Sequence, residues 1–113
     1  MSEQYLAIDN ATLFNLQYYM PEQTTLRQLA NAFSAFSDKT RLEILSALAL
    51  SPMCVGELSR YLKLNQTTLS HQLRLLKDIG AVTYKRYGKI IVYKLKDDII
   101  SEILSRGVDF ILK

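Results

Sequence analysis

The sequence has few of the side chains from which metal sites and disulfides are built. Its 113 residues include one cysteine, Cys54, and one histidine, His71. A single cysteine cannot form an intrachain disulfide, and this cysteine usage fits the cytoplasm, where thiols stay reduced. A zinc ion takes about four nitrogen, sulfur or oxygen ligands, and the soft ones are nearly absent here. We therefore expect neither a metal ion nor any other cofactor.

Motifs for catalysis and for membrane insertion are also absent. The sequence contains no glycine-rich phosphate loop, no nucleophile–base pair and no paired catalytic carboxylates with a histidine. No apolar run approaches the roughly 20 residues that a membrane-spanning helix needs. The first residues carry no basic segment of the kind that begins a secretory signal. We expect a cytoplasmic protein that is not an enzyme and has no membrane partner.

Acidic residues are nearly missing from one third of the chain. Residues 60–96 contain nine lysines and arginines against one acid, Asp78, which gives a net charge of +8. Residues 1–59 carry a net charge of −3 and residues 97–113 one of −2. Surfaces without a polyanionic partner usually intersperse both signs. A basic segment between two acidic ones is a localised electrostatic footprint and favours a nucleic-acid partner.

Residues 65–80 have the pattern of one helix with its start and stop signals. Asn65 is a good N-cap, because its side-chain oxygen can accept from the first turn, and Gly80 suits the left-handed residue that ends a helix. At about 100° per residue, the expected core face consists of Leu69, Leu73, Leu75, Leu76 and Ile79. The opposite face consists of Gln66, Thr67, Ser70, His71, Arg74 and Lys77. A polar helix face of this kind, taken alone, is more often simply solvated. Its amide, hydroxyl, imidazole and cationic groups are, however, the ones that bond to base edges and phosphates in a major groove.

The segment before this helix predicts a helix-turn-helix. Residues 56–62 have the pattern of a two-turn helix, with Leu58 and Tyr61 among its inward side chains. A tight link over residues 63–65 joins the two helices, and the second one has the polar outer face. Residues 53–55, just before the pair, could form a small edge strand.

After the helix, the period of the pattern changes to two. Residues 81–87 and 89–95 alternate well enough for two strands, with a turn at Gly88. The hairpin has a basic tip over residues 85–89, and a hairpin in this position is the wing of a winged helix-turn-helix. We therefore predict a mainly α fold with a small β-hairpin (α+β).

Further helices are expected on both sides of this core. They cover residues 10–20, 25–36, 38–50 and a last stretch from Asp97 or Asp98 to near the C-terminus. The expected caps of the first three are Asp9 or Asn10, Thr24 or Thr25, and Ser37. The last helix has a broad apolar surface formed by Ile99, Ile100, Ile103, Leu104, Val108, Ile111 and Leu112. This surface exceeds what a small core needs, so we expect the same helix of a second copy to cover it.

The chain length predicts a single domain over residues 1–113. We divide it into an N-terminal arm and short helix (1–24), dimer and core helices (25–50), the helix-turn-helix (55–80), the wing (81–96) and a dimerisation helix (97–113). Residues 1–9 show little pattern and are expected to be a flexible arm, and Tyr5, Tyr18 and Tyr19 add aromatic side chains to this end.

Several runs together resemble the ArsR/SmtB family of bacterial repressors. They are residues 36–45 (FSDKTRLEIL), 54–58 (CVGEL), 69–74 (LSHQLR) with Leu76 and Gly80, and Gly88 followed by Tyr93. The resemblance covers about residues 25–112. It implies a homodimer that binds a double-stranded DNA operator as a transcriptional repressor and leaves it when an inducer binds.

A winged helix-turn-helix binds DNA with its second helix in the major groove and its wing on the neighbouring backbone or minor groove. Amides, hydroxyls and the imidazole would read bases, and the cations would contact phosphates. The predicted DNA-binding residues are Lys63, Gln66, Thr67, Thr68, Ser70, His71, Arg74, Lys85, Arg86, Tyr87 and Lys89.

The resemblance also implies metal sites whose ligands this sequence does not keep. The positions matching the thiolates of arsenic- and cadmium-type members hold Cys54, Gly56 and Ser59. The positions matching the ligands of zinc-type members hold Asp97, Ile99, Phe110 and Lys113. The inducer is therefore left unidentified. Three interpretations of Cys54 stay open: a small buried residue, a redox-sensing thiol or a remnant metal ligand.

Two alternatives to a DNA-binding repressor stay open at this point. One is a winged-helix protein-interaction module without specific DNA binding. The other keeps the fold and makes the protein a thiol or metalloid sensor that acts through Cys54.

Overall fold

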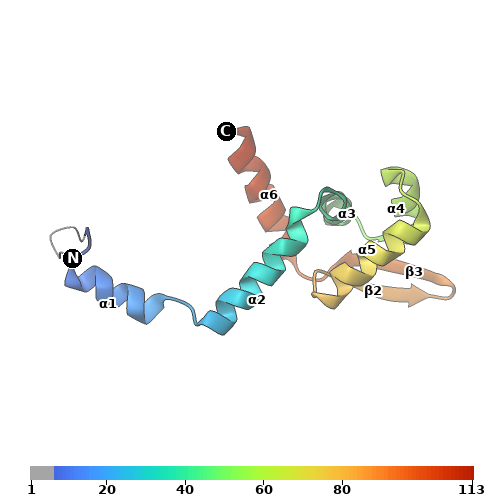
Figure 1. Ribbon diagram of the computed structural model, residues 1–113. Coiled ribbons are helices and arrows are strands. Elements are labelled where there is room, and N and C mark those ends of the chain that lie inside the picture. The colour runs from blue at the N-terminus through green and yellow to red at the C-terminus, as the bar shows by residue number, and fades with distance from the viewer. Residues whose placement is uncertain (1–6) are drawn as a thin grey trace. The chain divides into compact units, whose positions relative to one another are not determined.

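The computed structural model describes residues 7–113, which fall into two compact units. One unit ends at Asn31 and the other spans Ala32–Lys113. Six α-helices, one short 3-10 helix and three strands make up the described residues (Figure 1). None of these helices is long and apolar enough to cross a lipid bilayer. Most of the arm predicted over residues 1–9, including Tyr5, lies outside the described residues. The division of the chain as a single domain stays a prediction.

The first helix, α1, occupies Asn10–Tyr19. Asp9 caps it, since its Oδ1 accepts from the amide of Thr12 at 2.8 Å. This hydrogen bond holds the pKa of Asp9 below its ordinary value. The helix ends before Pro21, which cannot continue it. The predicted position and cap of this helix are therefore confirmed.

The second helix, α2, occupies Gln23–Ser34. The carbonyl of Glu22 accepts from the amide of Leu26 at 2.9 Å, which brings Gln23 into the first turn. Thr24 and Thr25 therefore lie inside the helix, and the prediction that one of them caps it is wrong. No residue of α2 is buried within the single chain.

A 3-10 helix over Ala35–Ser37 connects α2 to α3, which occupies Lys39–Leu50. Asp38 caps α3 by accepting from the amide of Arg41 at 3.0 Å. The prediction that Ser37 is the cap is wrong, because its hydroxyl donates back to the carbonyl of Ser34 at 2.6 Å. Ser37 thus closes the preceding turn and is unavailable to the next helix.

The helix-turn-helix consists of α4 (Val55–Leu62) and α5 (Gln66–Asp78). Leu58 of α4 is fully buried, but Tyr61 is 71% exposed and does not point inward as predicted. On α5, Leu75 and Ile79 are 38% and 49% exposed, so the predicted core face is too wide. The core of this small unit buries only a narrow stripe of α5, and Leu75 and Ile79 lie beside that stripe.

Three antiparallel strands form a sheet in the order β1-β3-β2. β1 (Met53–Cys54) is the predicted edge strand, and β2 (Val82–Tyr87) and β3 (Ile90–Leu95) are the hairpin. Gly88, with φ of 64°, makes the turn between β2 and β3, a conformation that glycine adopts without steric cost.

The last helix, α6, occupies Asp98–Leu112, and Asp97 caps it by accepting from the amide of Ile99 at 2.9 Å. It packs against α3 and β3 through Ile100, which is buried, and Leu104, which is half-buried. The buried core of the second unit is Ile44, Leu45, Ala47, Leu48, Leu58, Leu69, Leu73, Leu76, Ala81, Val82 and Ile100. The predicted fold class, mainly α with a small β-hairpin, is confirmed.

Candidate nucleic-acid interface

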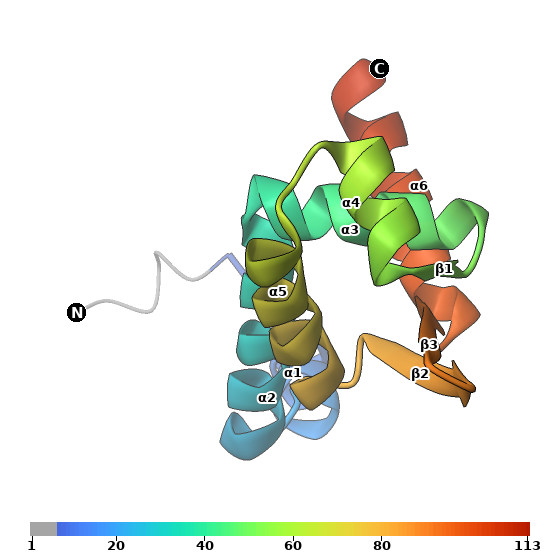
Figure 2. The ribbon, with the colours of Figure 1, turned by 90° about the vertical axis from the view of Figure 1, so that its right-hand side faces the viewer.

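The position of α5 is fixed by one stripe of leucines and by a polar cap. Leu69, Leu73 and Leu76 are fully buried, each at 0% exposure. The side-chain oxygen of Asn65 accepts from the amide of Thr68 at 2.7 Å, as predicted. At the other end Gly80 has φ of 81°, and the chain turns directly into β2. Burial of the leucine stripe therefore holds the polar face of α5 outward. Figure 2 shows how the chain runs from α4 through α5 into β2.

Five of the predicted DNA-binding residues come together on this outward face. They line one open hollow, and all are exposed: Gln66, Thr67, Ser70, His71 and Arg74. Thr68 is exposed too but does not line the hollow. No carboxylate lies among these residues, so the surface offers amide, hydroxyl, imidazole and guanidinium groups with no negative charge to repel a phosphate.

The link between the two helices places Lys63 in an unusual backbone conformation. Lys63 has φ of 59° and ψ of 42° and is the only non-glycine residue with positive φ among residues 7–113. The hydroxyl of Ser59 donates to the carbonyl of Leu64 at 2.6 Å, and the amide of Leu64 donates to the carbonyl of Ser59 at 3.2 Å. These bonds hold the link rigidly, with the side chain of Lys63 exposed beside the start of α5.

The four predicted wing residues lie on or next to the hairpin turn. Lys85, Arg86 and Tyr87 belong to β2, Lys89 follows Gly88 in the turn, and all four are exposed. The Nζ atom of Lys85 lies 5.5 Å from the centroid of the Tyr87 ring. The wing is thus a basic surface with an aromatic ring in it, separate from the hollow on α5.

Cys54 lies at the N-terminus of α4 and is half-buried. Its amide donates to Oε1 of Glu57 at 2.9 Å. That hydrogen bond holds the pKa of the Glu57 carboxyl below its ordinary value. Among residues 7–113, no three histidine, cysteine, aspartate or glutamate side chains gather as metal ligands would. The thiol stays a candidate sensor on position alone.

Sequence reasoning missed two contacts that join α5 to other elements. Lys77 was placed on the polar face of α5, but its Nζ lies over the ring of Tyr84 in the wing at 5.0 Å. Arg41 of α3 was not among the predicted site residues, but its guanidinium lies 3.4 Å from the side-chain oxygen of Gln72 on α5. Neither contact has a local sequence signal, because both join residues of different elements.

The transcriptional repressor SmtB homolog of Synechocystis is 34% identical over 100 residues, covering 86% of this chain and 76% of that protein. The family described as “Bacterial regulatory protein, arsR family” matches residues 38–84, which run from the cap of α3 into the wing. The chain belongs to the ArsR family of bacterial regulatory proteins. The predicted resemblance is thereby confirmed, and the family consists of transcriptional regulators rather than enzymes.

Solved structures of other ArsR-type regulators agree with the fold. The solution structure of apo-NmtR is 32% identical, with a TM-score of 0.68, and the match covers 78% of this chain and 74% of that one. A homodimeric winged helix-turn-helix DNA-binding domain from Mycobacterium bovis gives a TM-score of 0.73 at 24% identity, covering 81% of this chain and 88% of that one. The ArsR-family chain therefore has the winged helix-turn-helix fold, and the roles of its individual DNA-facing residues stay predictions.

Proposed function

We propose that two copies of this ArsR-family chain bind a twofold-symmetric DNA operator, repress transcription there, and are released by an inducer. The observation that carries the proposal is the exposed outer face of α5, on which Gln66, Thr67, Ser70, His71 and Arg74 surround one hollow with no carboxylate among them. Hydrogen-bonding groups of this kind, on a helix that a buried stripe holds outward, match the edge pattern of a major groove.

The cations of the link and wing supply the second part of the proposed docking. Lys63 lies beside the start of α5, while Lys85, Arg86 and Lys89 lie on the hairpin, and all are exposed. Such side chains neutralise phosphates and release counterions. With α5 in the groove, they would set register and orientation while the α5 hollow supplies base discrimination.

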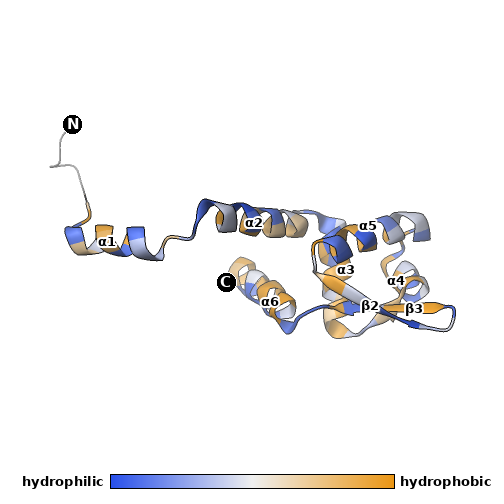
Figure 3. Cartoon of the chain, turned by 90° about the horizontal axis from the view of Figure 1, so that it is seen from below, coloured by the Kyte–Doolittle hydropathy of each residue, from blue (hydrophilic) through white to orange (hydrophobic). Residues whose placement is uncertain are grey.

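The proposed second copy covers the apolar surface of α6. Hydrophobic residues recur along this helix to its end (Figure 3), and its exposed ones are Ile99, Ile103, Val108, Phe110, Ile111 and Leu112. Large apolar surfaces of this kind mark interaction sites. A symmetric dimer would present two copies of α5 to two half-sites, which is how helix-turn-helix dimers read palindromic operators.

A titration of labelled duplexes by gel shift, repeated at several salt concentrations, tests the proposal. Selection from random duplexes supplies the operator. We expect a preferred twofold-symmetric sequence, with log affinity falling linearly as log salt rises. Equal weak binding to every duplex would contradict a specific regulator, and no binding at low salt would favour the protein-interaction module. The selected operator also locates the neighbouring genes, which narrows the chemistry of the inducer.

A further inference from the structure

Arg41 connects two parts of the protein that are far apart in sequence. Its Nε donates to the carbonyl of Ala35 at 2.9 Å, and its Nη1 lies 3.4 Å from Oε1 of Gln72. Ala35 belongs to the 3-10 corner between α2 and α3, whereas Gln72 lies in the middle of α5, 31 positions after Arg41. One guanidinium therefore joins the corner to the recognition helix.

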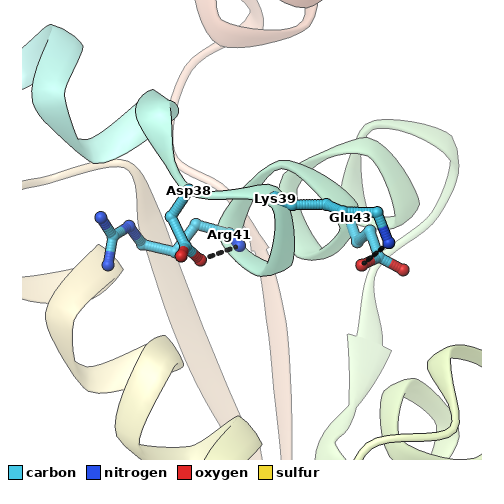
Figure 4. A network of polar contacts seen from close by, with 4 residues as sticks. All are labelled: Asp38, Lys39, Arg41 and Glu43. Atoms are coloured by element: carbon cyan, nitrogen blue, oxygen red, sulfur yellow. Dashed lines mark hydrogen bonds and ion pairs between the residues drawn. The ribbon is translucent and has the colours of Figure 1, made fainter.

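The backbone beside Arg41 is fixed separately from its side chain. The carboxylate of Asp38 accepts from the amide of Arg41 at 3.0 Å, while the guanidinium extends away from that carboxylate (Figure 4). Both Arg41 and Gln72 are half-buried, so the contact is partly shielded from water. Arginine suits this position because its planar fork presents several donors in fixed directions. The single ammonium of a lysine cannot take the place of Nε and Nη1 together.

Gln72 lies at the boundary between the two faces of α5. Its sequence neighbours are His71, which is exposed in the hollow, and Leu73, which is fully buried. Burial of leucines holds the helix in place without strong directional preference, but a hydrogen bond depends steeply on direction. The buried leucines fix which face of α5 points inward, and the bond from Arg41 to Gln72 adds a directional restraint on rotation of α5 about its own axis.

We propose that Arg41 is a positioning residue for DNA recognition, which acts through Gln72 to set the rotation of α5 and hence the aim of its hollow at base edges. The inference rests on the proposed function, because it assigns a cause to the specificity of DNA binding. At 3.4 Å the contact lies near the long limit of a hydrogen bond.

Four variants test the proposal in the full-length protein. Arg41→Lys keeps the charge and loses the fork, Gln72→Leu removes the acceptor, and the double variant removes both. Lys39→Gln is the matched control, since Lys39 is a cation of the same helix whose Nζ pairs with Glu43 at 3.3 Å and is remote from α5 in its contacts (Figure 4). Affinity is measured for the selected operator and for a random duplex of equal length at several salt concentrations, beside the thermal midpoint.

Each single variant should lower the operator-to-random affinity ratio about five- to tenfold, as expected for the net loss of one ordinary intramolecular hydrogen bond. The double variant should lose no more than either single one, because both changes break the same contact. Affinity for the random duplex and the salt slope should stay unchanged, and Lys39→Gln should match the wild type throughout.

Three outcomes would overturn the proposal. A parallel loss of affinity for the operator and the random duplex would make Arg41 a phosphate contact. Additive losses would remove the coupling to Gln72. A lower thermal midpoint with an unchanged affinity ratio would leave Arg41 a purely structural role. If the wild type itself prefers no duplex, the proposed function fails, and hydrogen exchange of the α5 amides in the free protein then tests the contact: equal rates in wild type and both single variants would refute it.

Discussion

Lys77 and Tyr84 join the recognition helix to the wing. The Nζ atom of Lys77, in the last turn of α5, lies 5.0 Å from the centroid of the Tyr84 ring on β2. Tyr84 also contacts Tyr93, its register partner on β3, with ring centroids 5.7 Å apart. A cation of the helix thus rests on an aromatic pair that spans both strands of the hairpin, and the root of the wing is held at the end of α5.

Replacing Tyr84 with leucine should weaken operator binding about two- to fivefold. An exposed cation–π contact contributes about 0.5–1 kcal/mol, and its loss lets the wing leave the orientation in which it meets the backbone. Tyr84→Phe keeps the ring and should bind like the wild type. Gel-shift titration of both variants measures the effect. Equal binding by Tyr84→Leu, Tyr84→Phe and wild type would show that the aromatic pair does not orient the wing.

Replacing Lys63 with glycine should make the protein more stable and a weaker DNA binder. A side chain in the left-handed region costs about 1–2 kcal/mol, and part of that strain is offset by the larger backbone entropy that glycine loses on folding. We expect a net gain of about 0.5–1 kcal/mol in the free energy of unfolding, measured by urea denaturation at fixed protein concentration. The loss of one phosphate contact should reduce the salt slope by about 0.9.

Lys63→Ala is the control for this pair of effects. Alanine removes the same charge but keeps a Cβ in the left-handed conformation, so the salt slope should fall without the gain in stability. Equal stability of the glycine and alanine variants would mean that the link relaxes its backbone freely, contrary to the bonds of Ser59 with Leu64.

Arg74→Ala and Gln66→Ala should fail in different ways. Arg74 is expected to contact a phosphate, so its loss should weaken binding to all duplexes alike and lower the salt slope. Gln66 is expected to read a base edge, so its loss should cost about 1–3 kcal/mol on the preferred sequence and relax the preference at one position. Selection from random duplexes with each variant separates the two patterns, and identical behaviour of the variants would refute this division of roles.

Stability should depend on pH through Glu57. Its carboxylate accepts from the amide of Cys54, which lowers its pKa from the ordinary value of 4.5. Because the folded state binds the proton less tightly than the unfolded state, the contribution is present above that value and is lost as pH falls through the lowered pKa. Glu57→Gln keeps an acceptor without the charge. Urea midpoints taken from about pH 7 to about pH 3 should fall less steeply in this variant than in the wild type below the ordinary pKa. Parallel curves would contradict the role of Glu57.

The features of the fold that follow from local chemistry could be read from the sequence. Asn65 and Asp9 were recognised as N-caps because a short side chain with an acceptor precedes an apolar period. Gly80 was recognised as the end of a helix and Gly88 as a turn, because backbone with positive φ favours glycine. Thr24 failed as a cap because the carbonyl of Glu22 starts the helix earlier. Several residues near the start of a helix can accept from its first-turn amides, and the sequence alone does not decide which of these neighbouring residues is the N-cap.

The features that depend on packing were predicted less well. Periodicity indicates a side of a helix but not the width of what covers it, so Leu75 was assigned to a core that reaches only its neighbour Leu76. The five residues of the α5 hollow could be predicted, because they share one face of one helix. The contact of Arg41 with Gln72 could not, since it depends on how two elements separated by 31 positions pack together.

The edge strand β1 has a consequence for how DNA is read. Cys54 pairs with Val92 and Met53 with Tyr93, so the strand that leads into α4 is part of the same sheet as the wing. These pairs hold the middle of β3 beside the start of α4 and so restrain the distance between the α5 hollow and the hairpin. If both surfaces engage one half-site, a duplex with a matching groove width fits best. Sequences that adopt this width at low deformation energy would bind better even at base pairs that no side chain touches.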